Sequence, residues 1–213
     1  MARDALTLEA SYDRTAEEYA RRYFDELAHK PFDRVLLERF ADAVRGRGPV
    51  CDLGCGPGQI ARFLRALGVD AIGVDLSPGM VELAKRLNPD IPFWLGNMFC
   101  LDVPDESWAG IAAFYSIIHV PRAAVVHVLA EMRRVLRPSG RLVLSFHLGH
   151  DDMHLDELWG EPVSMDFFFF ERDEMERYVT ASGFEVVESH QRPPYEAVEY
   201  QSHRGYIMAA KPG

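Results

Sequence analysis

Cysteine is scarce in this sequence, and long apolar runs are absent from it. Of 213 residues, only Cys51, Cys55 and Cys100 carry a thiol. Three thiols cannot all pair, which excludes a disulfide framework, and a cytosolic redox poise would keep them reduced. Residues 1–23 carry Arg, Asp and Glu where a secretion signal needs an apolar run, and no segment is apolar enough to span a bilayer. We therefore expect a cytoplasmic protein with no membrane partner.

Basic residues are fewer than acidic residues in this sequence. The chain has 23 Lys and Arg residues against 33 Asp and Glu residues, a formal net charge of −10. Such a surface repels a phosphate backbone, so we expect no nucleic-acid partner. The hydrophobic fraction of 48% is that of an ordinary globular protein, and 213 residues suit one well-buried domain better than two. We predict a single domain over residues 1–213.

Short apolar runs alternate with segments of helical periodicity along most of the chain. Residues 11–44 are predicted to be helical and residues 147–170 irregular. The order of the elements predicts a parallel sheet covered by helices on both faces, closed by a final hairpin with a long connection. Strands are predicted at 50–53, 71–75, 93–95, 111–115, 141–146, 184–189 and 206–210, and further helices at 60–67, 78–87, 123–136 and 174–181.

A glycine turn, Gly54-Cys55-Gly56-Pro57-Gly58, follows the first predicted strand. Such a turn lets the backbone approach a ligand, and the helix behind it offers unpaired N–H groups to an anionic group. Asp75 ends the second strand, where a carboxylate can accept hydrogen bonds from a ribose diol. The alternative is a tight turn and an acidic helix cap, but both features stand at matching strand ends. Together they predict a ligand that contains a nucleoside.

Two residues separate this turn from a dinucleotide fingerprint. The sixth motif position, which that fingerprint fills with glycine, holds Gln59, and the strand carries Asp52 shortly before the turn. The Asp52 carboxylate would sit badly beside a pyrophosphate. By Coulomb attraction it suits a ligand that carries positive charge near the loop.

The segment Val50-Cys51-Asp52-Leu53-Gly54-Cys55-Gly56-Pro57-Gly58 resembles the first motif of class I S-adenosylmethionine-dependent methyltransferases. The resemblance implies a Rossmann-like, doubly wound α/β sheet of seven strands, mostly parallel with a C-terminal antiparallel hairpin strand. It also implies methyl transfer to a small organic acceptor by in-line displacement. Further motifs of that family follow in order: Gly73-Val74-Asp75-Leu76-Ser77, Gly96-Asn97-Met98, Ile118-His119 and Leu136-Arg137-Pro138-Ser139-Gly140-Arg141.

The same resemblance assigns site residues for S-adenosylmethionine and its product S-adenosylhomocysteine. The glycine turn would receive the methionine end, Asp75 would hold the ribose hydroxyls, and Leu76 would pack on the adenine. Asn97 and Met98 would border the adenine amino edge, although many relatives carry Asp where Asn97 stands. The resemblance divides the domain into a helical lid (1–45), a cofactor-binding core (49–146) and an acceptor-side insertion with the final strands (147–213). The predicted cofactor-binding residues are Tyr19, Asp52, Gly54, Cys55, Gly56, Asp75, Leu76, Gly96, Asn97, Met98, Tyr115 and Ser116.

Methyl transfer needs alignment more than it needs proton chemistry, and it needs no metal. A general base helps only where the acceptor must lose a proton, and His119 and His147 are the predicted catalytic residues. His150 and His154 are weaker candidates, since histidines in such loops are more often ordinary surface residues. A metal site built from His147, His150, Asp151, Asp152 and His154 is the alternative for this segment, but the spacing matches no tight metal motif.

Aromatic residues indicate where the acceptor would bind. Tyr12 and Tyr19 share one helical face, which the resemblance places over the cofactor, although packing on the core is the alternative. Trp159 and Phe167-Phe168-Phe169-Phe170 fall in the insertion, where they either line an apolar acceptor pocket or fill the local core. We expect a hydrophobic or aromatic small-molecule acceptor.

Two other functions stay open at this stage. One is an NAD(P)-dependent oxidoreductase, against which Gln59 and Asp52 argue, and the other is a non-catalytic S-adenosylmethionine-binding protein. Amino groups of nucleic-acid bases are poor acceptors, because Tyr115-Ser116-Ile117-Ile118 stands where such enzymes carry an NPPY-like tetrad.

Overall fold

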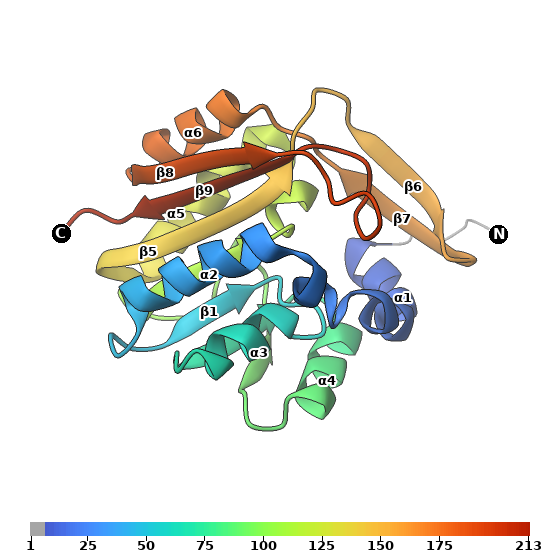
Figure 1. Cartoon of the computed structure of the whole chain (residues 1–213), viewed down its shortest axis with the longest axis horizontal. Coiled ribbons are helices and arrows are strands. Elements are labelled where there is room, and N and C mark those ends of the chain that lie inside the picture. Colours follow the sequence, from blue (N-terminus) through green and yellow to red (C-terminus); the bar gives the residue numbers. More distant parts are fainter. Residues whose placement is uncertain (1–6) are drawn as a thin grey trace.

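A seven-stranded sheet forms the centre of the computed structural model, which describes residues 7–213 (Figure 1). The strand order is β3-β2-β1-β4-β5-β9-β8. All neighbours are parallel except that β9 runs antiparallel to both β5 and β8, so the predicted fold class is confirmed. The strands are β1 (Val50–Leu53), β2 (Ala71–Asp75), β3 (Phe93–Leu95), β4 (Trp108–Phe114), β5 (Leu136–His147), β8 (Glu185–Arg192) and β9 (Arg204–Ala210).

Helices cover both faces of this sheet, and each face has its own apolar core. One core joins α2 and α3 to the sheet, and the other joins α5 and α6 to it. Strand alternation explains the division: Tyr206 and Met208 enter the first core, while Ile207 and Ala209 enter the second. The helices are α1 (Leu8–Tyr23), α2 (Pro31–Val44), α3 (Gln59–Ala66), α4 (Pro78–Leu87), α5 (Val125–Val135) and α6 (Arg172–Ala181), with short 3₁₀ turns η1 (Glu26–His29), η2 (Ile117–His119) and η3 (Arg122–Ala124).

The region predicted to be irregular contains a β-hairpin, so the sequence prediction for residues 147–170 is wrong. Strands β6 (Met153–Leu158) and β7 (Glu161–Phe167) pair antiparallel and form a separate two-stranded sheet. They are joined through Trp159 and Gly160, with φ of 55° and 85°. A two-residue turn of this kind needs positive φ at both positions, which Asn-Gly signals and Trp-Gly does not.

The predicted strand at 141–146 begins earlier than expected, since residues 138–140 also belong to it. These residues belong to β5, where Ser139 has a φ of 59° and donates its backbone N–H to the carbonyl of Lys211 at 3.0 Å. The predicted start of the fourth helix is confirmed: the Ser77 hydroxyl accepts a hydrogen bond from Met80 N at 3.0 Å, and Pro78 is the first helical residue.

Helix α1 lies at the carboxyl ends of the parallel strands, against β7 and α4 (Figure 1). Its docking contacts combine hydrogen bonds with a small apolar cluster, in which Ala16 packs with Met80 and Leu83. Asp13 accepts hydrogen bonds from the Ser77 hydroxyl at 2.5 Å and from Gly79 N at 2.7 Å, and the Ser11 hydroxyl accepts one from Ser164 N at 2.9 Å. The predicted lid begins at residue 1, and its first six residues lie outside the described part of the chain. Over residues 7–213, every helix is too short or too polar to cross a bilayer.

Candidate functional site

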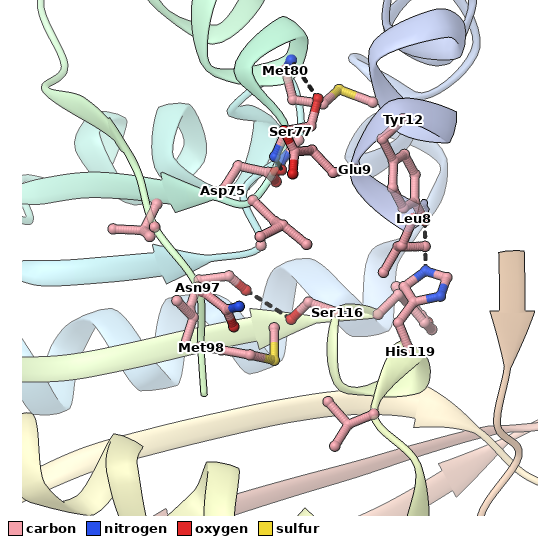
Figure 2. A pocket seen from close by; sticks show the side chains of 18 of the residues that line it. Leu8, Glu9, Tyr12, Asp75, Ser77, Met80, Asn97, Met98, Ser116 and His119 are labelled. Atoms are coloured by element: carbon pink, nitrogen blue, oxygen red, sulfur yellow. Dashed lines mark hydrogen bonds between the residues drawn. The ribbon is translucent and has the colours of Figure 1, made fainter. Parts of the chain in front are cut away.

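A cavity opens at the carboxyl ends of β1, β2 and β4 (Figure 2). The chain leaves β1 toward β2 and β3, then crosses to β4 on the other side, so the cavity stands at the topological switch point of the sheet. Open α/β sheets bind their ligands at this position. Eleven of the predicted site residues line the cavity: Tyr19, Gly54, Gly56, Asp75, Leu76, Gly96, Asn97, Met98, Tyr115, Ser116 and His119.

The glycine turn forms the floor of this cavity because its backbone has left-handed conformations. Gly54 and Gly56 have φ of 75° and 50°. A Cβ on Gly54 would lie 2.3 Å from the Ser116 Cβ, so no side chain fits there. A Cβ on Gly56 would have the Tyr19 ring as its nearest neighbour, at 3.7 Å. The space between Gly56 and Tyr19 is therefore one that a side chain would fill.

Asp75 connects the glycine turn to the second strand. One carboxylate oxygen accepts from Gly56 N at 2.8 Å, and the other accepts from Ser77 N at 2.9 Å. Burial raises the pKa of Asp75, and the two backbone hydrogen bonds oppose that rise. Each oxygen keeps a second lone pair, and Asp75 lines the cavity, so the carboxylate can accept further hydrogen bonds from a bound diol.

Asp52 and Cys55 do not line the cavity, in contrast to the other predicted cofactor-binding residues. The Asp52 carboxylate is buried and accepts from Ala61 N, in the first turn of α3, at 2.9 Å. Burial raises the pKa of Asp52 to about 8. This hydrogen bond fixes the start of α3, and the Asp52 side chain does not face the cavity. Cys55 is buried in the core against the same helix.

A second cavity adjoins the first one. Residues of α1, the β6–β7 hairpin and the segment 198–204 form its walls. The phenylalanine run divides between the two environments: Phe167 and Phe169 line this cavity, whereas Phe170 is fully buried in the core. Four aromatic residues line both cavities and form the wall between them: Tyr12, Tyr19, Phe114 and Tyr115.

Tyr115 in this shared wall has a strained backbone. It follows the last residue of β4 and has a φ of 53°, which is unusual for a bulky residue. Its N–H donates to the Ser145 carbonyl at 3.1 Å, and its hydroxyl lies 3.1 Å from that of Tyr206. Such strain persists where neighbouring contacts fix the residue, and it is most common at functional sites.

His119 stands at the first cavity with both ring nitrogens occupied. The carbonyl of Asp166 lies 2.7 Å from Nδ1 and can only accept, so Nδ1 carries the proton and Nε2 accepts from the Tyr12 hydroxyl at 2.6 Å. Burial lowers the pKa of His119 to about 4. The imidazole therefore stays neutral at physiological pH and is a weak proton acceptor.

His147, the other predicted catalytic residue, lines the second cavity instead. Its Nδ1 lies 2.7 Å from the Ser202 hydroxyl, and its ring packs against Tyr115 and Phe169. Burial and the positive charges of Arg204 and Lys30 lower the pKa of His147 to about 3. His147 too is neutral and weakly basic.

We expect the histidines to titrate in a fixed order on acidification. His154 should protonate first, because its hydrogen bond with Asp166 raises its pKa, followed by His119 near pH 4 and His147 near pH 3. Long-range ¹H–¹⁵N NMR spectra across this pH range resolve the order and the Nδ1 tautomer of His119. Titration of His119 near neutral pH would contradict its burial and restore it as a proton acceptor.

The proposed ligands of the alternative metal site are spread apart. His150 pairs with Glu171 at 3.2 Å, His154 pairs with Asp166 at 2.7 Å, and Asp152 pairs with Arg122 at 2.6 Å. No group of three or more His, Cys, Asp or Glu side chains suited to a metal ion is found in residues 7–213.

A buried ionic network beside the second cavity was missed by the sequence analysis. Its centre is Glu199, whose side chain is 1% exposed. The Glu199 carboxylate accepts two hydrogen bonds from Arg192, at 2.6 and 2.9 Å, and one from Tyr195 N at 2.8 Å. Lys30 Nζ lies 3.3 Å from the same carboxylate and Arg204 Nε lies 3.8 Å from it. Only Lys30 is distant from the others in sequence, but none of these residues belongs to a motif, so no local pattern indicates the network.

The sequence is similar to those of known methyltransferases. Residues 50–140 match the family described as "Methyltransferase domain". The demethylmenaquinone methyltransferase of Beutenbergia cavernae is 35% identical over 133 residues, which cover 61% of this chain and 55% of the relative. The malonyl-[acyl-carrier protein] O-methyltransferase of Serratia marcescens is 29% identical over 108 residues, 51% of this chain and 42% of the relative. The chain thus spans about half the length of these relatives.

Solved structures support the fold. The DhpI–SAH complex superposes with a TM-score of 0.73 at 20% identity, covering 94% of this chain and 93% of that one. YcgJ of Bacillus subtilis superposes with a TM-score of 0.65 at 20% identity, covering 84% of this chain and 98% of that one.

Proposed function

We propose that this chain, whose residues 50–140 belong to the methyltransferase domain family, transfers a methyl group from S-adenosylmethionine to a small organic acceptor. The observation that carries the proposal is the pairing of two adjoining cavities across one aromatic wall. The first holds the glycine turn, Asp75 and Asn97 together, and the second is lined mainly by aromatic and aliphatic side chains. Relatives that carry methyltransferase names support the same activity.

The residues of the first cavity fit this cofactor. The missing Cβ of Gly56 leaves a cradle under Tyr19, which suits the methionine end. Asp75 keeps acceptor capacity for the ribose hydroxyls. Leu76 offers an apolar contact for the adenine, and Asn97 and Met98 line the same space for its amino edge (Figure 2). In this proposal the ribose has a polar contact, and the adenine has both an apolar contact and polar ones.

The chain contributes positioning and the exclusion of water. When bound, S-adenosylmethionine supplies a reactive methyl group on a sulfonium. Tyr12, Tyr19 and Tyr115 enclose the boundary at which donor and acceptor would meet, and the Tyr12–His119 hydrogen bond holds α1 over that boundary. Fixed alignment in a water-poor space accounts for much of the acceleration of such displacements. In this proposal His119 positions Tyr12, and His147 contacts the acceptor as a neutral imidazole.

Calorimetric titration with S-adenosylmethionine, S-adenosylhomocysteine and NADH tests the cofactor. We expect the two adenosyl ligands to bind with micromolar affinity and NADH not to bind. Binding of NADH alone would overturn the proposal in favour of an oxidoreductase. Binding of the adenosyl ligands without turnover of any acceptor would leave a cofactor-binding protein instead of an enzyme.

Replacing Asp75 by alanine should weaken S-adenosylhomocysteine binding at least about tenfold. The change removes one or two hydrogen bonds to a charged acceptor, each of about 1.5–3 kcal/mol. Asp75→Asn keeps one carbonyl oxygen and should have an intermediate effect. Asp70→Ala, at the exposed other end of β2, is the matched control and should bind normally. Calorimetry measures the dissociation constant of each variant for S-adenosylhomocysteine. An unchanged constant for Asp75→Ala would show that Asp75 does not bind the ribose.

A further inference from the structure

Two buried cations line the second cavity, although its other walls are mostly apolar. Lys30 is 5% exposed and Arg204 is 3% exposed. Lys30 Nζ lies 5.2 Å from the centre of the Tyr115 ring, and the Arg204 guanidinium lies 5.5 Å from it. Because Tyr115 also lines the first cavity, both charges stand beside the wall across which the methyl group would pass.

Arg204 has hydrogen-bonding capacity that the protein does not use. Its Nη1 and Nη2 donate to the carbonyls of Ser202 and Tyr200, at 2.6 and 2.8 Å. Its Nε is buried and has no hydrogen-bond partner within residues 7–213. Glu199 is the nearest carboxylate, but at 3.8 Å from Nε it lies beyond hydrogen-bonding distance. A buried guanidinium with an unused donor is costly unless a ligand completes its hydrogen bonds.

The charges that line the cavity sum to zero, since Lys30 and Arg204 are balanced by Glu26 and Glu199. The donor adds one positive charge, on its sulfonium. A neutral hydroxyl acceptor would release a proton on methylation, and the imidazoles of His119 and His147 are both poor acceptors for it. An oxyanion has no proton to lose: its oxygen forms the bond to the methyl carbon, the C–S bond breaks, and that electron pair stays on sulfur. The two opposite charges cancel in the step.

We propose that the acceptor carries an oxyanion, either a carboxylate or an ionised acidic hydroxyl, and that Arg204 and Lys30 bind this group while the aromatic walls hold the rest of the molecule. This inference rests on the proposed function, because it places the acceptor in the second cavity. The acceptor is thus assigned a negative charge but not a chemical identity.

A series of small ligands on one ring tests the charge preference. Protein saturated with S-adenosylhomocysteine is titrated at pH 8 with 4-nitrobenzoate, 4-nitrophenolate, 4-nitrobenzamide and 4-nitrobenzylamine at up to millimolar concentration. We expect at least one anion to bind about tenfold or more tightly than the amide and the amine. Preference for 4-nitrobenzoate indicates a carboxylate acceptor, and preference for 4-nitrophenolate an acidic hydroxyl. Equal affinities, tighter binding of the amide or amine, or no binding of either anion would overturn the inference.

Arg204→Gln and Lys30→Gln should each reduce the preference for the anionic ligand over the amide and the amine by about tenfold, or remove it. Two variants are used because either cation also supports the loop around Glu199, and S-adenosylhomocysteine binding by each variant shows that it is folded. Arg22→Gln is the matched control: Arg22 stacks 5.0 Å from the ring of Trp159 but is a partly exposed residue outside the cavity lining. A preference that survives both substitutions would contradict the assignment. Failure to bind S-adenosylhomocysteine in the wild type would instead refute the proposed function, so the two failures are distinguishable.

Discussion

Replacing Gly56 by valine is expected to abolish S-adenosylhomocysteine binding, with an affinity at least about a hundredfold lower than that of the wild type. The φ of 50° at Gly56 is disfavoured for a β-branched residue, and the valine methyl groups would extend into the space under Tyr19. Both effects act on the part of the loop that a ligand must approach. Calorimetry measures the affinity, and circular dichroism shows whether the variant is folded.

Gly46→Val separates strain from site occupation. Gly46 has a comparable φ of 74°, but a Cβ there would have no neighbour within 4 Å. The strain of about 1–3 kcal/mol is therefore shared by the two variants, whereas only Gly56→Val fills the cavity. We expect Gly46→Val to bind the ligand normally. A folded Gly56→Val protein with normal affinity would show that the ligand does not approach this loop.

Replacing Glu199 by glutamine should lower the free energy of unfolding by about 3–5 kcal/mol, the range observed when one partner of a buried ion pair is removed. The amide keeps the shape of the side chain but leaves the buried charges of Lys30, Arg192 and Arg204 undercompensated. Urea denaturation of the variant gives the difference. Glu188→Gln is the control: Glu188 pairs with Arg39, which is 58% exposed, and with His190, which is 36% exposed, and pairs with such exposed partners contribute about 1 kcal/mol or less.

The contribution of Glu199 also has a defined pH dependence. Burial would raise the pKa of Glu199, but the hydrogen bonds from Arg192 and Tyr195 and the charges of Lys30 and Arg204 lower it to about 2. A carboxyl whose pKa is lower in the folded state stabilises the protein above its unfolded pKa of about 4.3. The stabilisation should therefore be complete at neutral pH and decrease between about pH 4 and pH 2. A difference between wild type and Glu199→Gln that stays constant down to pH 2 would contradict this account.

The sheet and the first cavity were predictable because their signals are local in the sequence. The run Val50–Leu53, the glycine turn and Asp75 each identify a strand end, and parallel strands bring such ends to one edge. Of these predictions, the fold class is confirmed, and residues 50–140 match the methyltransferase domain family. The roles of the individual side chains in that cavity remain predictions, although eleven of them share its lining.

The second cavity was only partly predictable, because its residues are assembled by tertiary contacts. His147 and Phe169 were identified from composition, but Lys30, Glu199 and Arg204 resemble ordinary surface charges in the sequence. Their burial depends on the connection between β8 and β9 folding back over α2, which no short pattern indicates. The hairpin that forms another wall was missed for a different reason, since its turn uses Trp159 at a position where asparagine is typical.

The small apolar contact of α1 has a consequence for local opening of the structure. The helix is held by hydrogen bonds and by one small apolar cluster, in which Ala16 packs with Met80 and Leu83. Its detachment therefore exposes less apolar surface than the loss of either main core, and it exchanges protein hydrogen bonds for hydrogen bonds to water. Such a helix can open as a local unit at a small fraction of the free energy of global unfolding. Such an opening would give access to the first cavity while the apolar cores on both faces of the sheet stay intact.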